Sequence, residues 1–411
     1  MAPSRLVLRG GDIVAPNRTI TGGALVIEDG RIAETLQTVP PLNGEEVRWV
    51  SGLVVPGFID LHSDALEKEI RPRPNATMPV DLAIMEFDRK LAGHGIVTVV
   101  HGLSFTETEG DFRAHADSAR IAALVRERRP GCLVRHLLHA RYEITDVGAA
   151  PTVHGLLASG ALCMLSFMDH APGGRQFKTV ADFARYYGPT LGRSAEAVHR
   201  LAEEKHRRKR EEAARLEAAA ADLARAAALR GVVIASHDDG SADDVAWAKR
   251  LGATLSEFPV SLEALTAARE SGLHIMMGAP NALRGRSTSG NLSALEALER
   301  GGVDSLCSDY YPASLLHAAL DLDARGLLTL PEAFKLVSLH PARALGIDDE
   351  TGSLEAGKAA DVVIVERRQS IPVVTRTFRD GREIFVAGYS HAPEVAATAA
   401  LCPAPQEFIS A

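Results

Sequence analysis

Cysteine is scarce in this chain of 411 residues. The four cysteines, Cys132, Cys163, Cys307 and Cys402, are scattered and form no C-x-x-C pair. This distribution argues against a disulfide framework and against a zinc site built on cysteines. We therefore expect a reduced, cytoplasmic setting.

Long apolar runs and an excess of positive charge are also absent from the sequence. No window reaches the length of a membrane span, and the N-terminal segment MAPSRLVLRGGDIV lacks the long apolar core of a signal peptide. The net charge is −8, which does not suggest a surface for nucleic acid. We expect neither a membrane nor a nucleic acid as partner, and an anionic substrate would need a local cluster of basic residues.

Both ends of the chain show the alternation of apolar and polar residues that is typical of β-strands. Residues 5–52 contain RLVLRGGDIV, GALVIEDGRIAETL and EEVRWV, and the C-terminal part contains ADVVIVE and VVTRTFRDGREIFVAG. The pairs Asp29-Gly30 and Asp380-Gly381 suit two-residue hairpin turns. We expect residues 1–52 and 346–411 to combine into a small β-sandwich domain.

The middle of the chain, residues 53–345, alternates apolar runs with helical stretches. The eight runs are VVPGFIDLHSD, IVTVVHGLSF, CLVRHLLHARYEI, ALCMLSFMDH, VVIASHDD, ATLSEFPV, HIMMGAPN and VDSLCSDY. Apolar strands separated by helices indicate parallel pairing with both faces of the sheet covered. Eight of them predict an α/β fold, a (β/α)₈ TIM-type catalytic barrel.

One connection in this barrel is unusually long. Residues 180–231, between the fourth and fifth runs, are rich in Ala, Glu, Arg and Leu, which are good helix formers. We expect an antiparallel pair of helices there. Its role is open between a solvated, charged element and a lid over the barrel mouth, where insertions after a strand lie.

Side chains suited to metal binding recur at the C-terminal ends of the predicted strands, where the chemistry of such barrels takes place. These ends carry His62 and Asp64 on the first run, His139, Arg141 and Glu143 on the third, Asp169 and His170 on the fourth, His237, Asp238 and Asp239 on the fifth, and Asp309 on the eighth. Residues two apart on a strand share a face, so His62 and Asp64 are expected to point together into the mouth.

The set predicts two divalent metal ions. The expected ligands are His62, Asp64, Glu143, His170, His237 and Asp309. Imidazole and carboxylate together suit Zn²⁺, Mn²⁺ or Fe²⁺. We expect Glu143 to bridge the ions, His170 and His237 to hold the second one, and a metal-bound hydroxide to be the nucleophile. Asp309 would ligate the first ion and take a proton from the bridging water as the catalytic base.

At these residues the chain resembles the amidohydrolase superfamily. The order of PGFIDLHSD, a bridging carboxylate, two histidines and a late aspartate follows its metal pattern, and GSLEAGKAADVVIVE is similar to its returning β-sandwich segment. The usual His-x-His motif has Asp64 in its second position here. No lysine stands at the third or fourth strand end, so the resemblance assigns the bridge to Glu143.

Six longer segments resemble one family within that superfamily. They are DLHSDALEKEIRPRP, FMDHAPGGRQF, ASHDDGSADDV, SEFPVSLEA, MGAPNALRGRSTSGN and SDYYPASLL. The family is that of the α-D-ribose 1-methylphosphonate 5-triphosphate diphosphatases of the carbon–phosphorus lyase pathway. The resemblance implies hydrolysis that releases diphosphate from a triphosphate and leaves the 5-phosphate.

Basic residues gather near the expected ligands. The candidates for substrate binding are Lys68, Arg71 and Arg73 after the first run, Arg141 on the third, Arg175 and Lys178 after His170, and Arg284 and Arg286 in NALRGRSTSGN. The planar fork of arginine donates two hydrogen bonds at once to a phosphate. We expect a small phosphorylated substrate. Asp238 and Asp239 would either bind an additional Mg²⁺ on the triphosphate or cap the following helix.

Two other functions are open to the same sequence. An amidohydrolase cleaving a C–N bond of a cyclic amide or N-acyl substrate would keep the fold and the metals, and an apolar or carboxylate-binding pocket would favour it. A barrel that has lost its metals would act as a scaffold, although the complete ligand set argues against this. Barrels of this superfamily often form homodimers, and we leave a homodimer open.

Overall fold

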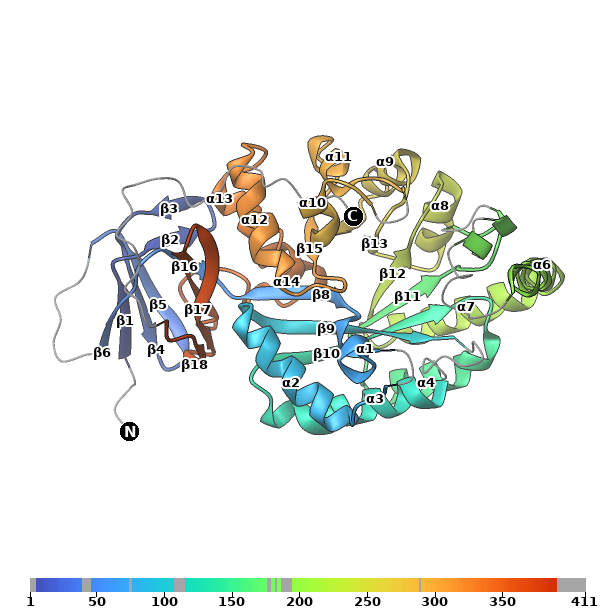
Figure 1. The fold of residues 1–411 in the computed structure, drawn as a ribbon, viewed down its shortest axis with the longest axis horizontal. Coiled ribbons are helices and arrows are strands. Elements are labelled where there is room, and N and C mark those ends of the chain that lie inside the picture. Colours follow the sequence, from blue (N-terminus) through green and yellow to red (C-terminus); the bar gives the residue numbers. More distant parts are fainter. Residues whose placement is uncertain are drawn as a thin grey trace.

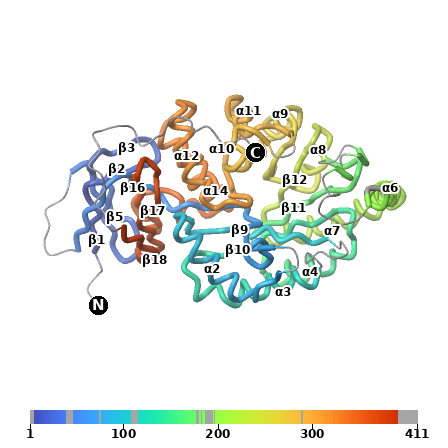
Figure 2. The backbone as a smooth tube through the Cα atoms, in the orientation of Figure 1, coloured from blue at the N-terminus to red at the C-terminus, as the bar shows by residue number. Residues whose placement is uncertain are grey.

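The computed structural model describes residues 5–38, 46–73, 76–106, 115–175, 179–181, 183–185, 194–287 and 290–389. These residues form a β-sandwich beside a larger barrel of strands and helices (Figure 1). The sandwich is built from both ends of the chain, blue and red in Figure 2, and the barrel from the middle. The predicted fold class is confirmed.

The sandwich consists of two sheets. Its strands are β1 (Arg5–Arg9), β2 (Asp12–Ala15), β3 (Arg18–Ile20), β4 (Ala24–Glu28), β5 (Arg31–Leu36), β6 (Glu46–Trp49), β7 (Leu53–Pro56), β16 (Val362–Arg368), β17 (Ile371–Arg379) and β18 (Arg382–Val386). One sheet has the order β5-β4-β1-β6 and the other β18-β17-β16-β7-β2-β3. A single apolar cluster, which includes Leu8, Leu25, Val54 and Ile364, lies between them.

The six-stranded sheet also packs against the barrel. Along β7 and β16, alternate residues face opposite sides, because the side-chain period of a strand is two. Val54 and Ile364 belong to the sandwich core, whereas Val55, Val363 and Val365 belong to the core cluster of the barrel. The strand β7 lies entirely beyond residue 52, where the sequence predicts the end of the N-terminal part of the sandwich. It nevertheless belongs to the sandwich, because it pairs with β16 and β2.

The barrel is an eight-stranded parallel sheet in sequential order. Its strands are β8 (Phe58–Ser63), β9 (Ile96–Phe105), β10 (Arg135–Glu143), β11 (Met164–Met168), β12 (Val233–His237), β13 (Leu255–Glu257), β14 (His274–Gly278) and β15 (Ser305–Cys307). Each contains part of one of the eight predicted runs. A parallel bridge between Ser63 and Asp309 joins the last strand to the first and closes the barrel.

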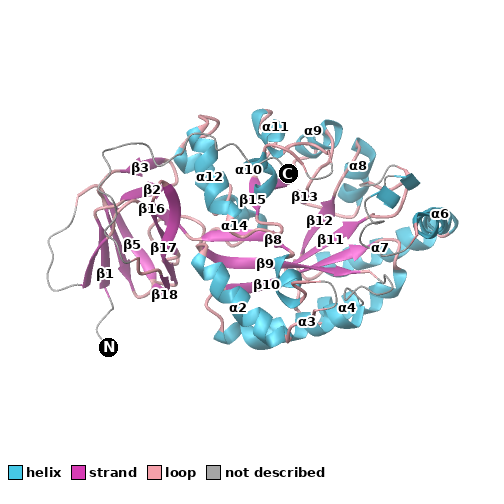
Figure 3. Ribbon diagram, in the orientation of Figure 1, coloured by secondary structure: helices cyan, strands magenta, loops and turns pink. Residues whose placement is uncertain are grey.

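Helices surround the barrel strands (Figure 3). They are α1 (Ala65–Ile70), α2 (Val80–Gly93), α3 (His115–Arg128), α4 (Ala150–Ala158), α6 (Ala195–Glu211), α7 (Ala213–Ala228), α8 (Ala242–Arg250), α9 (Leu262–Glu270), α10 (Ala279–Arg284), α11 (Ala294–Glu299), α12 (Ser314–Ala324), α13 (Leu330–Lys335) and α14 (Leu339–Leu345), with short 3₁₀ turns η1 (Arg129–Gly131) and η2 (Val147–Ala149). None of the described helices is both long and apolar enough to span a membrane.

The barrel interior is layered. An apolar layer is formed by Leu61, Val100, Met164, Ala235, Leu255, Met276 and Cys307. The residues two positions further along the same strands are, from β9 onward, Gly102, Ser166, His237, Glu257, Gly278 and Asp309. Because these positions share the inward face, a largely polar layer lies directly above the apolar one, toward the C-terminal ends of the strands. The site is built on this layer.

The long insertion differs from the predicted antiparallel helix pair. Only Glu212 separates α6 from α7, which is too short a connection for a helical hairpin. Figure 1 shows α6 end-on while α7 lies across the view, so the two helices point in different directions. The apolar residues Leu216, Ala220 and Leu223 of α7 are buried, whereas α6 is charged over most of its length.

Candidate active site

A pocket opens at the C-terminal ends of the barrel strands and has a volume of about 240 Å³. It is lined by His62, Asp64, Arg141, His170, His237, Asp238, Phe258, Pro259, Val260, Met277, Gly278, Asn281, Arg284, Arg286, Ser287, Asn291, Leu292, Asp309 and Tyr310. Five of the six predicted metal ligands are in this lining, together with three of the predicted substrate-binding arginines. No described residue of the insertion lines it, which gives the lid hypothesis no support.

Closure of the barrel positions Asp309 against the first strand. The backbone N–H of Asp309 donates to the carbonyl of His62 at 3.0 Å, and the N–H of Asp64 donates to the carbonyl of Asp309 at 2.9 Å. The side chains of all three residues line the pocket. Burial and the nearby Asp64 carboxylate raise the pKa of Asp309 to about 6. Oδ1 of Asp64 is buried and has no hydrogen-bond partner among the described residues.

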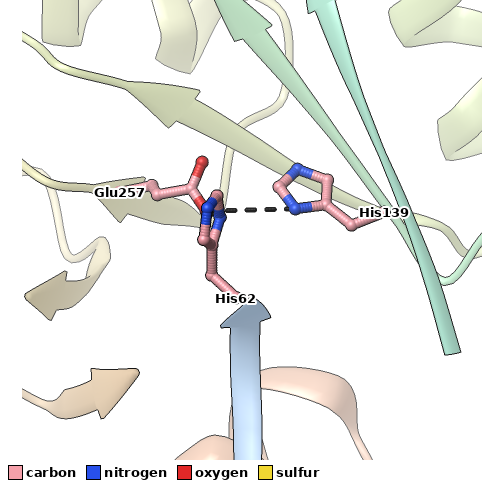
Figure 4. A group of neighbouring side chains, drawn as sticks. All are labelled: His62, His139 and Glu257. Atoms are coloured by element: carbon pink, nitrogen blue, oxygen red, sulfur yellow. Dashed lines mark hydrogen bonds and ion pairs between the residues drawn. The ribbon is translucent and has the colours of Figure 1, made fainter. Parts of the chain in front are cut away.

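A glutamate that the sequence interpretation did not select lies at the centre of the site. Oε1 of Glu257 is 2.6 Å from Nδ1 of His62, and its Oε2 is 2.5 Å from Nδ1 of His237. Figure 4 shows Glu257 and His139 meeting His62 at the end of β8. Burial alone would raise the pKa of Glu257, but the surrounding imidazoles outweigh it and hold this pKa well below its usual range. The carboxylate therefore accepts a hydrogen bond from each Nδ1–H, so that in the neutral form of each ring Nε2 carries the free lone pair.

His139 is the third imidazole beside Glu257. Its Nε2 lies 2.8 Å from Oγ of Ser166, and its Nδ1 lies 3.9 Å from Oε1 of Glu257. Burial lowers the pKa of His139 to about 3, so this ring is neutral. It packs edge-on to His62, with ring centroids 5.7 Å apart. His139 thus contributes to the walls that hold His62 in place.

His170, His237 and Asp238 form a second group of ligand atoms. Oδ2 of Asp238 lies 3.5 Å from Nε2 of His170 and 3.6 Å from Nε2 of His237. Ligands of a tetrahedral Zn²⁺ with bonds of about 2.0–2.1 Å are themselves about 3.3–3.4 Å apart. Oδ2 of Asp238 therefore lies from each histidine nitrogen at nearly the spacing that one such ion requires, and the three ligand atoms all lie within 4.8 Å of one another.

Backbone conformations that are rare for residues other than glycine occur at three strand ends around the pocket. Asp238, Phe258 and Asp309 have φ values of 54°, 56° and 54°. Each such residue costs on the order of 1–3 kcal/mol and persists where the surroundings hold it. Here each N–H continues the strand ladder, donating to Glu257, Met276 and His62 respectively.

Asp238 and Asp239 do not cap the following helix, contrary to one of the two roles predicted for them. The N-cap of α8 is Ser241, whose side chain accepts from the N–H of Asp244. Asp238 faces the pocket, whereas Asp239 is fully buried and bonded to Ser236 and Ser256. The two neighbouring side chains therefore point in different directions, Asp238 toward the pocket and Asp239 away from it.

Glu143 is placed differently from the predicted bridge. Its Oε2 accepts from the backbone N–H of His170 at 3.1 Å, and its Oε1 accepts from Oγ1 of Thr145 at 2.8 Å. It is buried and is not part of the pocket lining. Glu143 therefore supports the loop that carries His170, and it is Asp238 that meets both His170 and His237.

Arg175, which the sequence predicts to bind substrate, instead has a structural position. Its Nη1 donates to the carbonyls of Phe167 and His237, each at 3.2 Å, and lies 3.0 Å from Oδ1 of Asp239. The side chain is 4% exposed. Because its donors serve the ends of β11 and β12, Arg175 holds together the two strands that carry His170 and His237.

The other predicted basic residues divide between the pocket and its surroundings. Arg284 and Arg286 line the pocket from the end of α10 and the loop after it. The exposed Lys68 places its Nζ 4.6 Å from the ring centre of Tyr310, at the rim. Arg71 and Arg73 do not line the pocket. Lys178 lies outside the described residues.

Two groups of donors in the pocket lining suit divalent cations, and in the second group the ligand atoms all lie within 4.8 Å of one another. One group offers His62, Asp64 and Asp309, with an unpartnered buried oxygen on Asp64 and a raised pKa on Asp309 that a cation would relieve. The other offers His170, His237 and Asp238. The chemistry of these donors, imidazole nitrogen and carboxylate oxygen, suits Zn²⁺, Mn²⁺ or Fe²⁺.

Glu257 could have been found from the sequence by the rule that found the other ligands. It stands two residues after the apolar Leu255 in the sixth predicted run, as His237 stands two residues after Ala235 in the fifth. For Asp238 the sequence left open an additional Mg²⁺ on the triphosphate or a helix cap, and the strand period alone places this residue on the opposite face from His237.

Comparisons with known proteins identify the family of this chain. The model of the amidohydrolase family matches residues 194–387. The α-D-ribose 1-methylphosphonate 5-triphosphate diphosphatase of Escherichia coli (strain K12) is 33% identical over 387 residues, covering 92% of this chain and 100% of the relative.

Solved structures of other enzymes share the fold. The ochratoxinase of A. niger superposes with a TM-score of 0.64 at 14% identity, covering 93% of this chain and 96% of that one. The N-acetyl-D-glucosamine-6-phosphate deacetylase of Mycobacterium smegmatis superposes with a TM-score of 0.60 at 16% identity, covering 94% and 100%. The full-length relative and the family match show that the chain belongs to the amidohydrolase superfamily, and within it to the family of α-D-ribose 1-methylphosphonate 5-triphosphate diphosphatases.

Proposed function

We propose that this protein is a metal-dependent hydrolase that releases diphosphate from α-D-ribose 1-methylphosphonate 5-triphosphate or a related phosphorylated compound. The observation that carries the proposal is the composition of one pocket, whose lining combines Arg284 and Arg286 with imidazoles and carboxylates. A triphosphate needs cationic donors for its oxygens and a site that activates water beside them. The relative that matches over its whole length bears this activity in its name.

The candidate metal ligands and the base have distinct roles in the activation of the attacking water. Divalent ions, when bound, lower the pKa of a water molecule and offset the charge of the phosphates. His62, Asp64 and Asp309 would hold one ion, and His170, His237 and Asp238 the other. Asp309 would accept the proton that the water loses.

Bond making and breaking take place at the bridge between the α- and β-phosphoryl groups. The water oxygen forms a bond to the α-phosphorus, and the bond from that phosphorus to the bridging oxygen breaks, so the bridging oxygen leaves with the diphosphate. The products are diphosphate and the 5-phosphate. Arg284 and Arg286 bind the leaving diphosphate and neutralise the charge that develops on it.

A product assay tests the proposal against cleavage of a C–N bond. Purified protein is incubated with Mn²⁺, Zn²⁺ or Fe²⁺ and with ribosyl phosphonate triphosphate, nucleoside triphosphates, and cyclic and N-acyl amides. Phosphorus NMR should show diphosphate and a monophosphate. Release of orthophosphate alone, or turnover of amides without turnover of any triphosphate, would refute it.

A further inference from the structure

Arg141 makes an unusual contact with one of the candidate metal ligands. Its Nη2 lies 3.0 Å from Nε2 of His237. A guanidinium is always protonated and can only donate, so Nε2 of His237 must be the acceptor. This agrees with the other side of the ring, where Nδ1 donates to Glu257. The lone pair that accepts from Arg141 is the same lone pair that a metal ion would need.

The guanidinium also lies among the other groups that a cation would bind. Its positive charge acts to lower the pKa of His62, Asp309 and Asp238, against stronger opposing influences at His62 and Asp309. The side chain is 8% exposed, and its Nε has no hydrogen-bond partner among the described residues. Arg141 thus combines a buried positive charge, an unused donor and a position in the pocket lining.

Space for this arrangement is provided by Gly102 of the neighbouring strand. A Cβ at this position would lie 3.1 Å from Cδ of Arg141 and 3.1 Å from Cε1 of His62. These distances are shorter than ordinary contacts between carbon atoms, at about 3.5–4.0 Å. The glycine thus leaves the arginine room to lie beside the histidines.

We propose that Arg141 and a metal ion compete for His237, so that metal binding moves the guanidinium from Nε2 of His237 to a phosphate oxygen in the pocket. In the metal-free protein Arg141 occupies the ligand and offsets the nearby carboxylates. When a metal ion takes the lone pair of His237, the donors of Arg141 become available to an anion. The inference needs His237 to be a metal ligand, but it does not depend on which phosphorylated compound is hydrolysed.

Metal affinity in the absence of any substrate tests the competition. Zn²⁺ is titrated into metal-free protein against a chromophoric chelator for the wild type, Arg141→Met and Arg284→Met. Methionine keeps most of the volume but cannot donate, and loss of one hydrogen bond from a charged group corresponds to about 10- to 100-fold. Arg141→Met should therefore bind Zn²⁺ more tightly by about that factor. Arg284→Met removes the same charge from the same pocket and should change the affinity by less than about threefold.

Two results would overturn the competition. One is an Arg141→Met affinity equal to or weaker than that of the wild type. The other is an equal gain in Arg284→Met, which would mean a general effect of charge. If Arg141→Met does not fold, Arg141→Lys provides the test, because its shorter side chain weakens the contact with His237 while it keeps the charge; it should also bind Zn²⁺ more tightly than the wild type.

The transfer of Arg141 to an anion has its own measurement. Inorganic phosphate is titrated into the metal-loaded wild type and the metal-loaded Arg141→Met protein by calorimetry. We expect phosphate to bind the variant about tenfold or more weakly. Equal affinities would show that Arg141 does not move to the anion. Neither titration measures hydrolysis, so failure here is distinguishable from failure of the proposed function.

Discussion

Replacement of Glu257 by glutamine should leave only one of the two histidines that this residue orients in the tautomer that binds a metal ion. The carboxylate accepts from Nδ1 of His62 and from Nδ1 of His237. A glutamine side chain has one oxygen and one NH₂ group, so it can accept from one ring but must donate to the other. The ring that accepts at Nδ1 carries its proton on Nε2. That ring can no longer ligate a metal ion through Nε2.

The expected size of the effect follows from these contacts. Loss of a carboxylate that orients a ligating histidine typically lowers metal affinity by about 10- to 100-fold. One hydrogen bond to a charged group contributes about 1.5–3 kcal/mol, so the free energy of unfolding of the metal-free protein should fall by a similar amount. Chelator competition with Zn²⁺ and urea unfolding measure the two quantities.

Asp60→Asn is the matched control for Glu257→Gln. Asp60 is equally buried, and its carboxylate accepts from the N–H and Oγ of Ser308 and from the backbone N–H of His62, but from no imidazole among the described residues. It should lower stability while leaving the Zn²⁺ affinity within about threefold of the wild type. If Glu257→Gln binds Zn²⁺ as tightly as the wild type, the orienting role assigned to Glu257 is wrong.

Further predictions concern the base, the arginines and pH. Asp309→Asn should lower kcat by about 10²–10⁴-fold while metal content by atomic absorption stays near that of the wild type, and a near-normal rate would remove Asp309 as the base. Arg284→Ala combined with Arg286→Ala should raise KM for triphosphates at least tenfold more than KM for any uncharged substrate, and an equal rise would contradict a phosphate role. Arg175→Met leaves Asp239 buried without its cation and should cost about 3–5 kcal/mol in urea unfolding, whereas Arg286→Met, at an exposed site, should cost less than about 0.5 kcal/mol. The pKa of Asp309 is raised from 3.8 to about 6, so folded protein binds a proton that unfolded protein releases; stability of the metal-free protein should fall by up to about 3 kcal/mol as the pH rises from about 4 to 6, and Asp309→Asn should abolish that part of the decrease.

Local patterns in the chain were sufficient to predict the barrel strands and several of the residues that line the pocket. The alternation of apolar runs and helical stretches predicted the barrel, because strand and helix periods depend on neighbouring residues alone. His62, His237 and Asp309 could be assigned to the mouth because they end strands of a parallel barrel. The same rule applies to Glu257, because this residue also ends a barrel strand.

Only the tertiary structure decided what the loop residues do. Arg175 and Arg284 are alike in sequence terms, since both follow a barrel strand, yet one is buried against Asp239 and the other lines the pocket. Asp238 reaches the pocket because its left-handed backbone overrides the strand period. The direction of a loop side chain depends on contacts with residues distant in the chain, and these exist only once the barrel has closed.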